Sequence, residues 1–197
     1  FGFKLTSRLE GFDGTYKQGT YNIDTGMTKR QIMELLQSGK VAQDLQLMIP
    51  EGYTAKQIAA KAEEIGICTA EEFINEMNNG TFDYEFLKDL PDRQYKLEGY
   101  LFPDTYEVFV GDEVSMINAM LENFKKKIES EDIQKLLGKS KYTLDEIITM
   151  ASIVEREGAD NTEFGKVASV FYNRINSKTY PFLESCATVQ YVLPERK

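Results

Sequence analysis

The chain has 197 residues, of which 42% are hydrophobic and 28% are charged, a composition typical of a globular protein with a buried core. Its 32 acidic and 23 basic residues give a formal net charge of −9, which argues against a nucleic-acid partner because phosphate binding needs a basic face. The absence of histidine excludes a Ser-His-Asp triad, a Cys-His pair and any zinc site that needs imidazole. We therefore expect acid/base chemistry from Glu, Asp, Lys, Tyr or Cys, with no metal ion and no cofactor.

The cysteines and the chain ends say less about function. Cys68 and Cys186 lie far apart in the sequence, and we interpret them as two small buried apolar side chains, with a single disulfide as the alternative. No apolar stretch approaches the ~20 residues that a membrane-spanning helix needs. The abrupt ends at Phe1 and Lys197 are interpreted as cuts in a longer protein.

The N-terminal part is predicted to mix short strands and short helices in a compact α+β module. Lys4 to Leu9 alternates weakly, as in a strand, and residues 19–23 form a second candidate strand. Thr28 is predicted to cap a helix that ends at Gly39. Residues 45–49 alternate and predict a further strand.

Two more helices follow, and each begins after a threonine. Thr54 is predicted to cap a helix whose apolar face extends to Ile65. Thr69 and Glu72 have the spacing of a capping box for the next helix. Breaks at residues 78–80 and 89–92 follow it, and we place a domain boundary between residues 90 and 91.

The second part begins with a segment dense in aromatic residues, 97–106, which predicts strand and turn. Ser115 is predicted to open a long helix that reaches Ile128. A helix is also predicted from Phe164 to Ile175, from its apolar period, whereas residues 185–191 fit either a strand or a helix.

One helix between these two carries an unexpected carboxylate. A capping box at residues 143–146 starts the helix, and Gly158 is a plausible stop. At ~100° per residue, Glu155 projects between Ala151 and Ile148, inside the apolar face. We expect burial there to raise the pKa of its carboxyl, as a general acid requires. The alternatives, that Glu155 reaches solvent or pairs with Arg174, are favoured by the periodicity alone.

Four blocks, in order, resemble the YceG-like endolytic murein transglycosylases, also called MltG. Upstream, residues 19–21, 26–28 and 49–54 resemble the LysM-like module that precedes the catalytic part in this family. The resemblance covers essentially the whole chain, and the chain departs from the family at Glu184 and Cys186, where the family has Gln and an acidic residue. The four blocks are LEGYLFPDTY at 97–106, ASIVERE at 151–157, KVASVFYNR at 166–174 and ATVQY at 187–191.

The resemblance implies an α+β fold in two domains. Residues 1–90 would form a LysM-like module with a helical extension, and residues 91–197 a C-terminally truncated transglycosylase domain with a catalytic helix. Glu155, the first Glu of its block, corresponds to the family's single catalytic acid/base. The candidates for hydrogen bonding substrate or shaping the cleft, for which a structural role is equally open, are Glu98, Asp104, Tyr106 and Asn173.

The implied reaction is endolytic cleavage of the MurNAc–GlcNAc bond of peptidoglycan, which leaves 1,6-anhydro-MurNAc ends. We expect peptidoglycan glycan strands as substrate and cell-wall synthases as partners. We also expect attachment to the cell membrane by one N-terminal helix absent from this chain, with the catalytic part on the extracytoplasmic side. The alternatives are a non-catalytic peptidoglycan-binding module, a true hydrolase and a scaffold beside cell-wall synthases.

Overall fold

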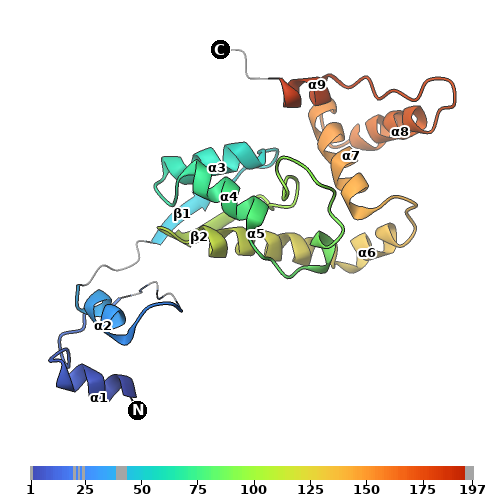
Figure 1. Ribbon diagram of the computed structural model, residues 1–197. Coiled ribbons are helices and arrows are strands. Elements are labelled where there is room, and N and C mark those ends of the chain that lie inside the picture. Colours follow the sequence, from blue (N-terminus) through green and yellow to red (C-terminus); the bar gives the residue numbers. More distant parts are fainter. Residues whose placement is uncertain (1, 20, 22, 24, 39–43, 194–197) are drawn as a thin grey trace.

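The computed structural model describes residues 2–19, 21, 23, 25–38 and 44–193. Within them the chain is rich in helix and has a single two-stranded sheet, which confirms the α+β class (Figure 1). The elements in chain order are α1 (Gly2–Leu9), α2 (Lys29–Ser38), β1 (Asp44–Met48), α3 (Ala55–Glu64), α4 (Ala70–Asn79), the 3-10 turn η1 (Glu85–Leu87), β2 (Thr105–Phe109), α5 (Glu113–Ile128), α6 (Glu131–Leu137), α7 (Leu144–Glu157), α8 (Phe164–Ile175) and α9 (Cys186–Val192).

The sheet joins segments that are distant in the sequence. β1, the strand predicted at residues 45–49, pairs antiparallel with β2, which follows the aromatic segment. The register places Leu45 opposite Val108 and Leu47 opposite Tyr106, so that apolar side chains of both strands face the same side. The alternation of the two strands therefore matches, and the apolar side of the pair faces the core.

The sheet, α3, α4 and α5 enclose a large hydrophobic core, which we call the main core. Its fully buried side chains include Leu47, Phe73, Tyr100 and Leu121, which come from four different segments. Residues on both sides of position 90 therefore share one core and one sheet. The packing shows no separation at this position. The division into a LysM-like module and a catalytic domain therefore stays a prediction.

The N-terminal part differs from the prediction in two places. Residues 2–9 form the helix α1, with Ser7 buried and its hydroxyl accepting a 2.5 Å hydrogen bond from Tyr16, so the weak alternation was misleading. Of the strand expected at 19–23, residues 20 and 22 lie outside the described residues, and the described positions carry no strand assignment. α2 is confirmed after Thr28, whereas its predicted stop at Gly39 lies outside the described residues.

The other predicted helices are confirmed, with one shift of a terminus. α4 and α7 begin with the capping boxes that the sequence indicates, and α3 begins after the predicted cap Thr54, which forms a capping box with Gln57 as well. α5 begins two residues before Ser115, because the side chain of Asp112 accepts the Ser115 amide and so caps the helix. The ambiguous segment at 185–191 is helical and forms most of α9.

α7, α8 and α9 form the end of the molecule that lies away from α1 and α2 (Figure 1). α7 packs against both α8 and α9. A second group of buried side chains, the small cluster, lies between α7 and α8 and consists of Met150, Ile153, Val154 and Phe171. Within the part of the chain that the structure describes, no helix has the length and hydropathy needed to cross a membrane.

Candidate active site

α7 is held on the main core by its N-terminal half. The hydroxyl of Tyr100 donates a 2.9 Å hydrogen bond to Asp145, and the guanidinium of Arg93 lies 3.1 Å from the same carboxylate. Gly99 comes so close to Ile148 that a Cβ on Gly99 would lie 2.8 Å from its Cγ2 atom. The aromatic segment thus fixes the N-terminal half of α7, and the C-terminal half of the helix extends beyond the main core.

Glu155 lies on that last part of α7 and is exposed, so the prediction that it is buried in an apolar face is wrong. The partner helix α8 covers the edge of α7 that carries Met150, Ile153 and Val154, whereas Ala151 is exposed. The buried stripe is therefore turned away from Glu155 over the C-terminal half of the helix. The burial expected of this carboxyl is therefore absent, and the alternative that Glu155 reaches solvent is the one observed.

Although Glu155 is exposed, one side of its carboxyl faces another part of the protein, the turn between β1 and α3. The carboxyl lines an open groove of about 310 Å³ together with Arg156, and the opposite wall is the turn between β1 and α3. A Cβ placed on Gly52 would lie 3.8 Å from Oε1 of Glu155, which shows how close the turn comes. The residues on that opposite wall are Glu51, Gly52, Tyr53 and Gln57.

The turn that faces Glu155 depends on a glycine and an arginine. Gly52 has φ of +76°, a left-handed conformation that favours glycine. Its carbonyl oxygen accepts a 3.1 Å hydrogen bond from Nη2 of Arg156, the neighbour of Glu155. Arg156 therefore joins the two walls directly beside the candidate catalytic carboxyl.

Glu98 is a predicted substrate contact whose side chain lies next to this turn. Both of its carboxylate oxygens accept the backbone N–H of Ala55, the first residue of α3, at 3.1 Å. The hydroxyl of Tyr191 donates a 3.0 Å hydrogen bond to Oε2. Burial raises the pKa of Glu98 above its ordinary value, and the hydrogen bonds from Ala55 and Tyr191 oppose that rise.

Asp104 and Tyr106 have contacts of a structural kind. Asp104 accepts its neighbour's amide, that of Thr105, at 2.8 Å and the side-chain amide of Asn123 at 3.2 Å. Tyr106 is 5% exposed and its hydroxyl donates to the carbonyl oxygen of Phe102 at 2.6 Å. Asn173 is exposed on α8. The roles predicted for Glu98, Asp104, Tyr106 and Asn173 stay predictions.

Sequence reasoning missed the contacts of Glu157. Oε1 of this residue accepts the hydroxyl of Ser185 at 2.6 Å and the backbone N–H of Ala187 at 3.0 Å. These hydrogen bonds, led by that of Ser185, hold the pKa of Glu157 below its ordinary value. Glu157 caps the first turn of α9 from another helix, a pairing that no local spacing announces. For the opposite wall of the groove a signal existed, because Gly52 falls in the segment at 49–54 that resembles the family's LysM-like module.

The cysteines are both free thiols. Cys68 is half-buried, and burial, reinforced by Glu113, raises its pKa to about 11. Cys186 is exposed at the start of α9, so its predicted burial is wrong, because the first turn of α9 faces solvent there. Within the described ranges, no group of three or more His, Cys, Asp or Glu residues is arranged to hold a metal ion.

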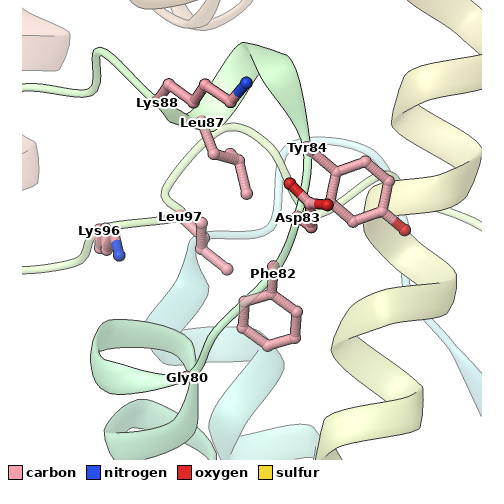
Figure 2. Close-up of a pocket in the computed structure, with 8 residues that line it drawn as sticks. All are labelled: Gly80, Phe82, Asp83, Tyr84, Leu87, Lys88, Lys96 and Leu97. Atoms are coloured by element: carbon pink, nitrogen blue, oxygen red, sulfur yellow. The ribbon is translucent and has the colours of Figure 1, made fainter.

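A second, smaller pocket of about 100 Å³ shares no residue with the groove. Phe82, Leu87 and Leu97 line its interior, and Lys88 and Lys96 stand at its edge (Figure 2). The ammonium of Lys88 is paired with Glu85. Asp83, an exposed carboxyl, also lines this pocket, so the two hollows differ mainly in size, and the groove at Glu155 is the larger of the two.

Comparison with known proteins places the chain in a family. The sequence profile of the YceG-like family matches residues 1–197. The chain belongs to this family. The family resemblance predicted from the four blocks is therefore confirmed.

Three relatives illustrate the match. An endolytic murein transglycosylase of Bacillus subtilis strain 168 is 29% identical over 208 residues, which cover 99% of this chain and 56% of the relative. The endolytic murein transglycosylase of Streptococcus pneumoniae serotype 2 strain D39 is 32% identical, over 81% of this chain and 33% of its own length. The crystal structure of a YceG-like protein from Listeria monocytogenes superposes with a TM-score of 0.61 at 29% identity, over 99% of this chain and 67% of that one. The chain thus spans from a third to just over half of the two transglycosylases.

Proposed function

We propose that this chain acts on peptidoglycan as an endolytic lytic transglycosylase, with Glu155 as its single catalytic acid/base. Two YceG-like relatives named endolytic murein transglycosylases support the reaction class. The observation that carries the assignment of Glu155 is its exposed carboxyl in the groove opposite the Gly52 turn. An acid/base that must meet a long polymer has to be reached from solvent, and an open groove offers that access.

The proposed reaction uses one carboxyl group twice. The Glu155 acid first protonates the glycosidic oxygen of the bond between MurNAc and GlcNAc, and this oxygen leaves with the GlcNAc residue. The resulting carboxylate then accepts the proton of the 6-hydroxyl of MurNAc as that oxygen bonds to the anomeric carbon. The product is a 1,6-anhydro end and no water is consumed, because the attacking hydroxyl is already part of the sugar.

The exposure of Glu155 has a consequence for this reaction. A strand lying in the groove would displace water from the carboxyl, and the loss of water favours the neutral acid that protonates a leaving oxygen. Tyr53, on the opposite wall, offers an aromatic surface next to the same space. Binding of the substrate would therefore exclude water from a carboxyl that is exposed in the free groove.

The remaining assignments belong to the same proposal. Peptidoglycan lies outside the cytoplasmic membrane, so we place this chain on the extracytoplasmic side, anchored to the membrane and working beside cell-wall synthases. Residues 1–90 would act as the LysM-like module and residues 91–197 as the catalytic domain. Glu98 and Asn173 would contribute to the substrate cleft, together with Asp104 and Tyr106 through the positions they hold.

Product analysis with Glu155→Gln tests the proposal. We expect wild-type chain to release fragments with anhydro ends from purified glycan strands, and Glu155→Gln to release none while keeping the wild-type melting temperature. Glu107→Gln, at an exposed position of β2, is the matched control and should keep full activity. Anhydro ends made by Glu155→Gln would refute the assignment.

The same mass spectra separate the rival functions. A second carboxylate, Glu51, lines the groove with Glu155, and a pair of carboxylates is what most glycoside hydrolases use. A hydrolase yields reducing ends that are one water heavier than the anhydro ends. A non-catalytic binding module would bind the strands and release no fragment.

A further inference from the structure

The groove lies between two bodies that are joined by α7. Leu144 and Ile148, in the N-terminal half of the helix, pack on the main core. Met150 and Val154, further along, belong to the small cluster with α8. Glu155 projects from this second body, whereas the turn it faces is attached to the first. Its distance from the opposite wall therefore depends on whatever fixes the two bodies to each other.

α9 is attached to the second body at its beginning. The hydrogen bonds that Glu157 accepts from Ser185 and from the Ala187 amide are 2.6 and 3.0 Å long. Ser185, the residue before α9, makes no side-chain cap of its own to this helix. Glu157 thus supplies the missing cap from a position two residues beyond Glu155, and the start of α9 follows the end of α7.

α9 is attached to the first body near its end. The hydroxyl of Tyr191 donates to Glu98, and the same carboxylate holds the Ala55 amide at the start of α3. Ala55 follows directly after the turn that forms the opposite wall of the groove. α9 therefore spans from the end of α7 to the base of that turn, and the contacts close a ring around the groove.

We propose that Tyr191 and Glu98 form a latch which, with Glu157 at the other end of α9, fixes the distance between Glu155 and the Gly52 turn together with the direct hydrogen bond from Arg156 to Gly52. Tyr191 and Glu98 are then positioning residues, since they act on the reaction through the groove wall and not through the reacting atoms. This inference rests on the proposed function. It also makes a claim about α9 that is independent of activity.

The chemistry of the latch suits a fixed contact. Burial, followed by the neighbouring Glu98 carboxylate, raises the pKa of Tyr191 to about 12, so its hydroxyl keeps the proton that it donates. Glu98 is occupied by the Ala55 amide on its other side, which restricts the direction it presents to Tyr191. Tyr191 as a whole is 54% exposed and lies outside both clusters of buried side chains, so removal of its hydroxyl leaves no cavity in a core.

Tyr191→Phe tests the latch because it removes a single oxygen atom. Tyr180→Phe is the matched control: Tyr180 also donates to a carboxylate, that of Glu184, but this pair lies within one loop and spans no groove. Hydrogen exchange measured by mass spectrometry should be about tenfold faster in residues 186–192 of Tyr191→Phe, from the strength of a hydrogen bond to a charged group. Exchange in α5 should be unchanged, and Tyr180→Phe should behave as wild type in both segments. Unchanged exchange in residues 186–192 of Tyr191→Phe would overturn the latch whatever the activity.

The activity of the same variants tests the positioning role. For Tyr191→Phe we expect kcat on glycan strands to fall about tenfold, because small misplacements of reacting groups have large effects on rate. Strand binding, measured in the Glu155→Gln background with and without Tyr191→Phe, should agree within about twofold, since the walls that contact the strand remain. Adding Glu98→Gln to Tyr191→Phe should lower kcat less than Glu98→Gln does alone, because the two residues share one contact.

The outcomes are distinguishable. If Tyr191→Phe loosens α9 and leaves kcat unchanged in an active chain, the positioning role is overturned. If wild-type chain yields no cleavage product, the proposed function fails and the positioning role fails with it. Even then, the exchange experiment shows whether Tyr191 holds α9 to the first body.

Discussion

The main core and the small cluster show two ways of holding a structure together. In the main core many side chains, such as Phe73, Tyr100 and Leu121, are fully buried, whereas no member of the small cluster is less than 5% exposed. The end of the molecule that carries Glu155 relies more on polar contacts, including those of Arg156 and Glu157. Hydrophobic burial therefore supports the scaffold, and hydrogen bonds set the geometry of the groove. Regions with little buried apolar surface also open locally most easily.

Truncating one side chain in each region should give the largest contrast. Leu121→Ala in the main core should lower the free energy of unfolding by about 2–5 kcal/mol, because it removes apolar contacts and leaves a cavity. Phe171→Ala in the small cluster should release α8 while α5 keeps its wild-type hydrogen exchange. Urea unfolding measures the first effect and exchange by segment the second. Faster exchange in α5 of Phe171→Ala would mean that the two regions unfold as one.

The sequence predicted the structural features that depend on residues close together in the chain, and it missed those that depend on distant residues. The cap at Thr54 and the capping boxes at Thr69 and Thr143 gave the starts of three helices, because these motifs are complete within four residues. The partner of β1 and the cap that Glu157 provides for α9 depend on residues far apart in the sequence. No pattern within one segment contains that information.

The exposure of Glu155 also depends on a distant part of the sequence. Helical periodicity placed it correctly beside Ala151 and Ile148, but which side of α7 is covered depends on α8. The family resemblance indicated the residue, and its groove came only with the fold. Gly52 and Arg156, which shape that groove, are joined by a hydrogen bond across 104 positions of the sequence.

The two cysteines allow the main core and the α7–α9 end of the molecule to be compared by thiol reactivity. Cys68 packs against the main core, and its pKa of about 11 compares with 9.0 for an ordinary thiol, so its thiolate fraction near pH 8 is lower by about a hundredfold. Cys186 is exposed on α9. Iodoacetamide followed by peptide mapping should therefore modify Cys186 well before Cys68, and the two should react alike in urea. Equal rates in the folded chain would show that Cys68 is more accessible than its burial indicates.

The joint between the two regions can be tested at Gly99. Gly99 and Gly111 have φ of +85° and +75°, so alanine is strained at both, but only at Gly99 would the new Cβ meet a side chain, that of Ile148. Gly99→Ala should therefore lower the free energy of unfolding by about 1–3 kcal/mol more than Gly111→Ala does, through the overpacking against α7. Thermal unfolding of the two variants measures the difference. Equal losses would mean that α7 moves away from Gly99 without penalty.

The smallest effect concerns pH, and it separates the two ends of α9. Hydrogen bonds from Ser185 and Ala187 lower the pKa of Glu157, so its contact with α9 is complete above the ordinary value of 4.5 and is lost as the pH falls through the lower folded value. Burial raises the pKa of Glu98, so Glu98 takes up its proton above 4.5 as the pH falls.

The backbone amides bound to these carboxylates report each step. In an NMR titration the Ala55 amide should shift with a midpoint above pH 4.5, and the Ala187 amide with a midpoint below it. Glu157→Gln should abolish the lower transition at Ala187 and leave the upper one at Ala55, because the amide side chain does not titrate. The reverse order of midpoints would mean that burial dominates at Glu157 and hydrogen bonding at Glu98. In that case the end of α9 nearest Glu155 would be the weakly held one, and Tyr191 would be the stronger anchor of the helix.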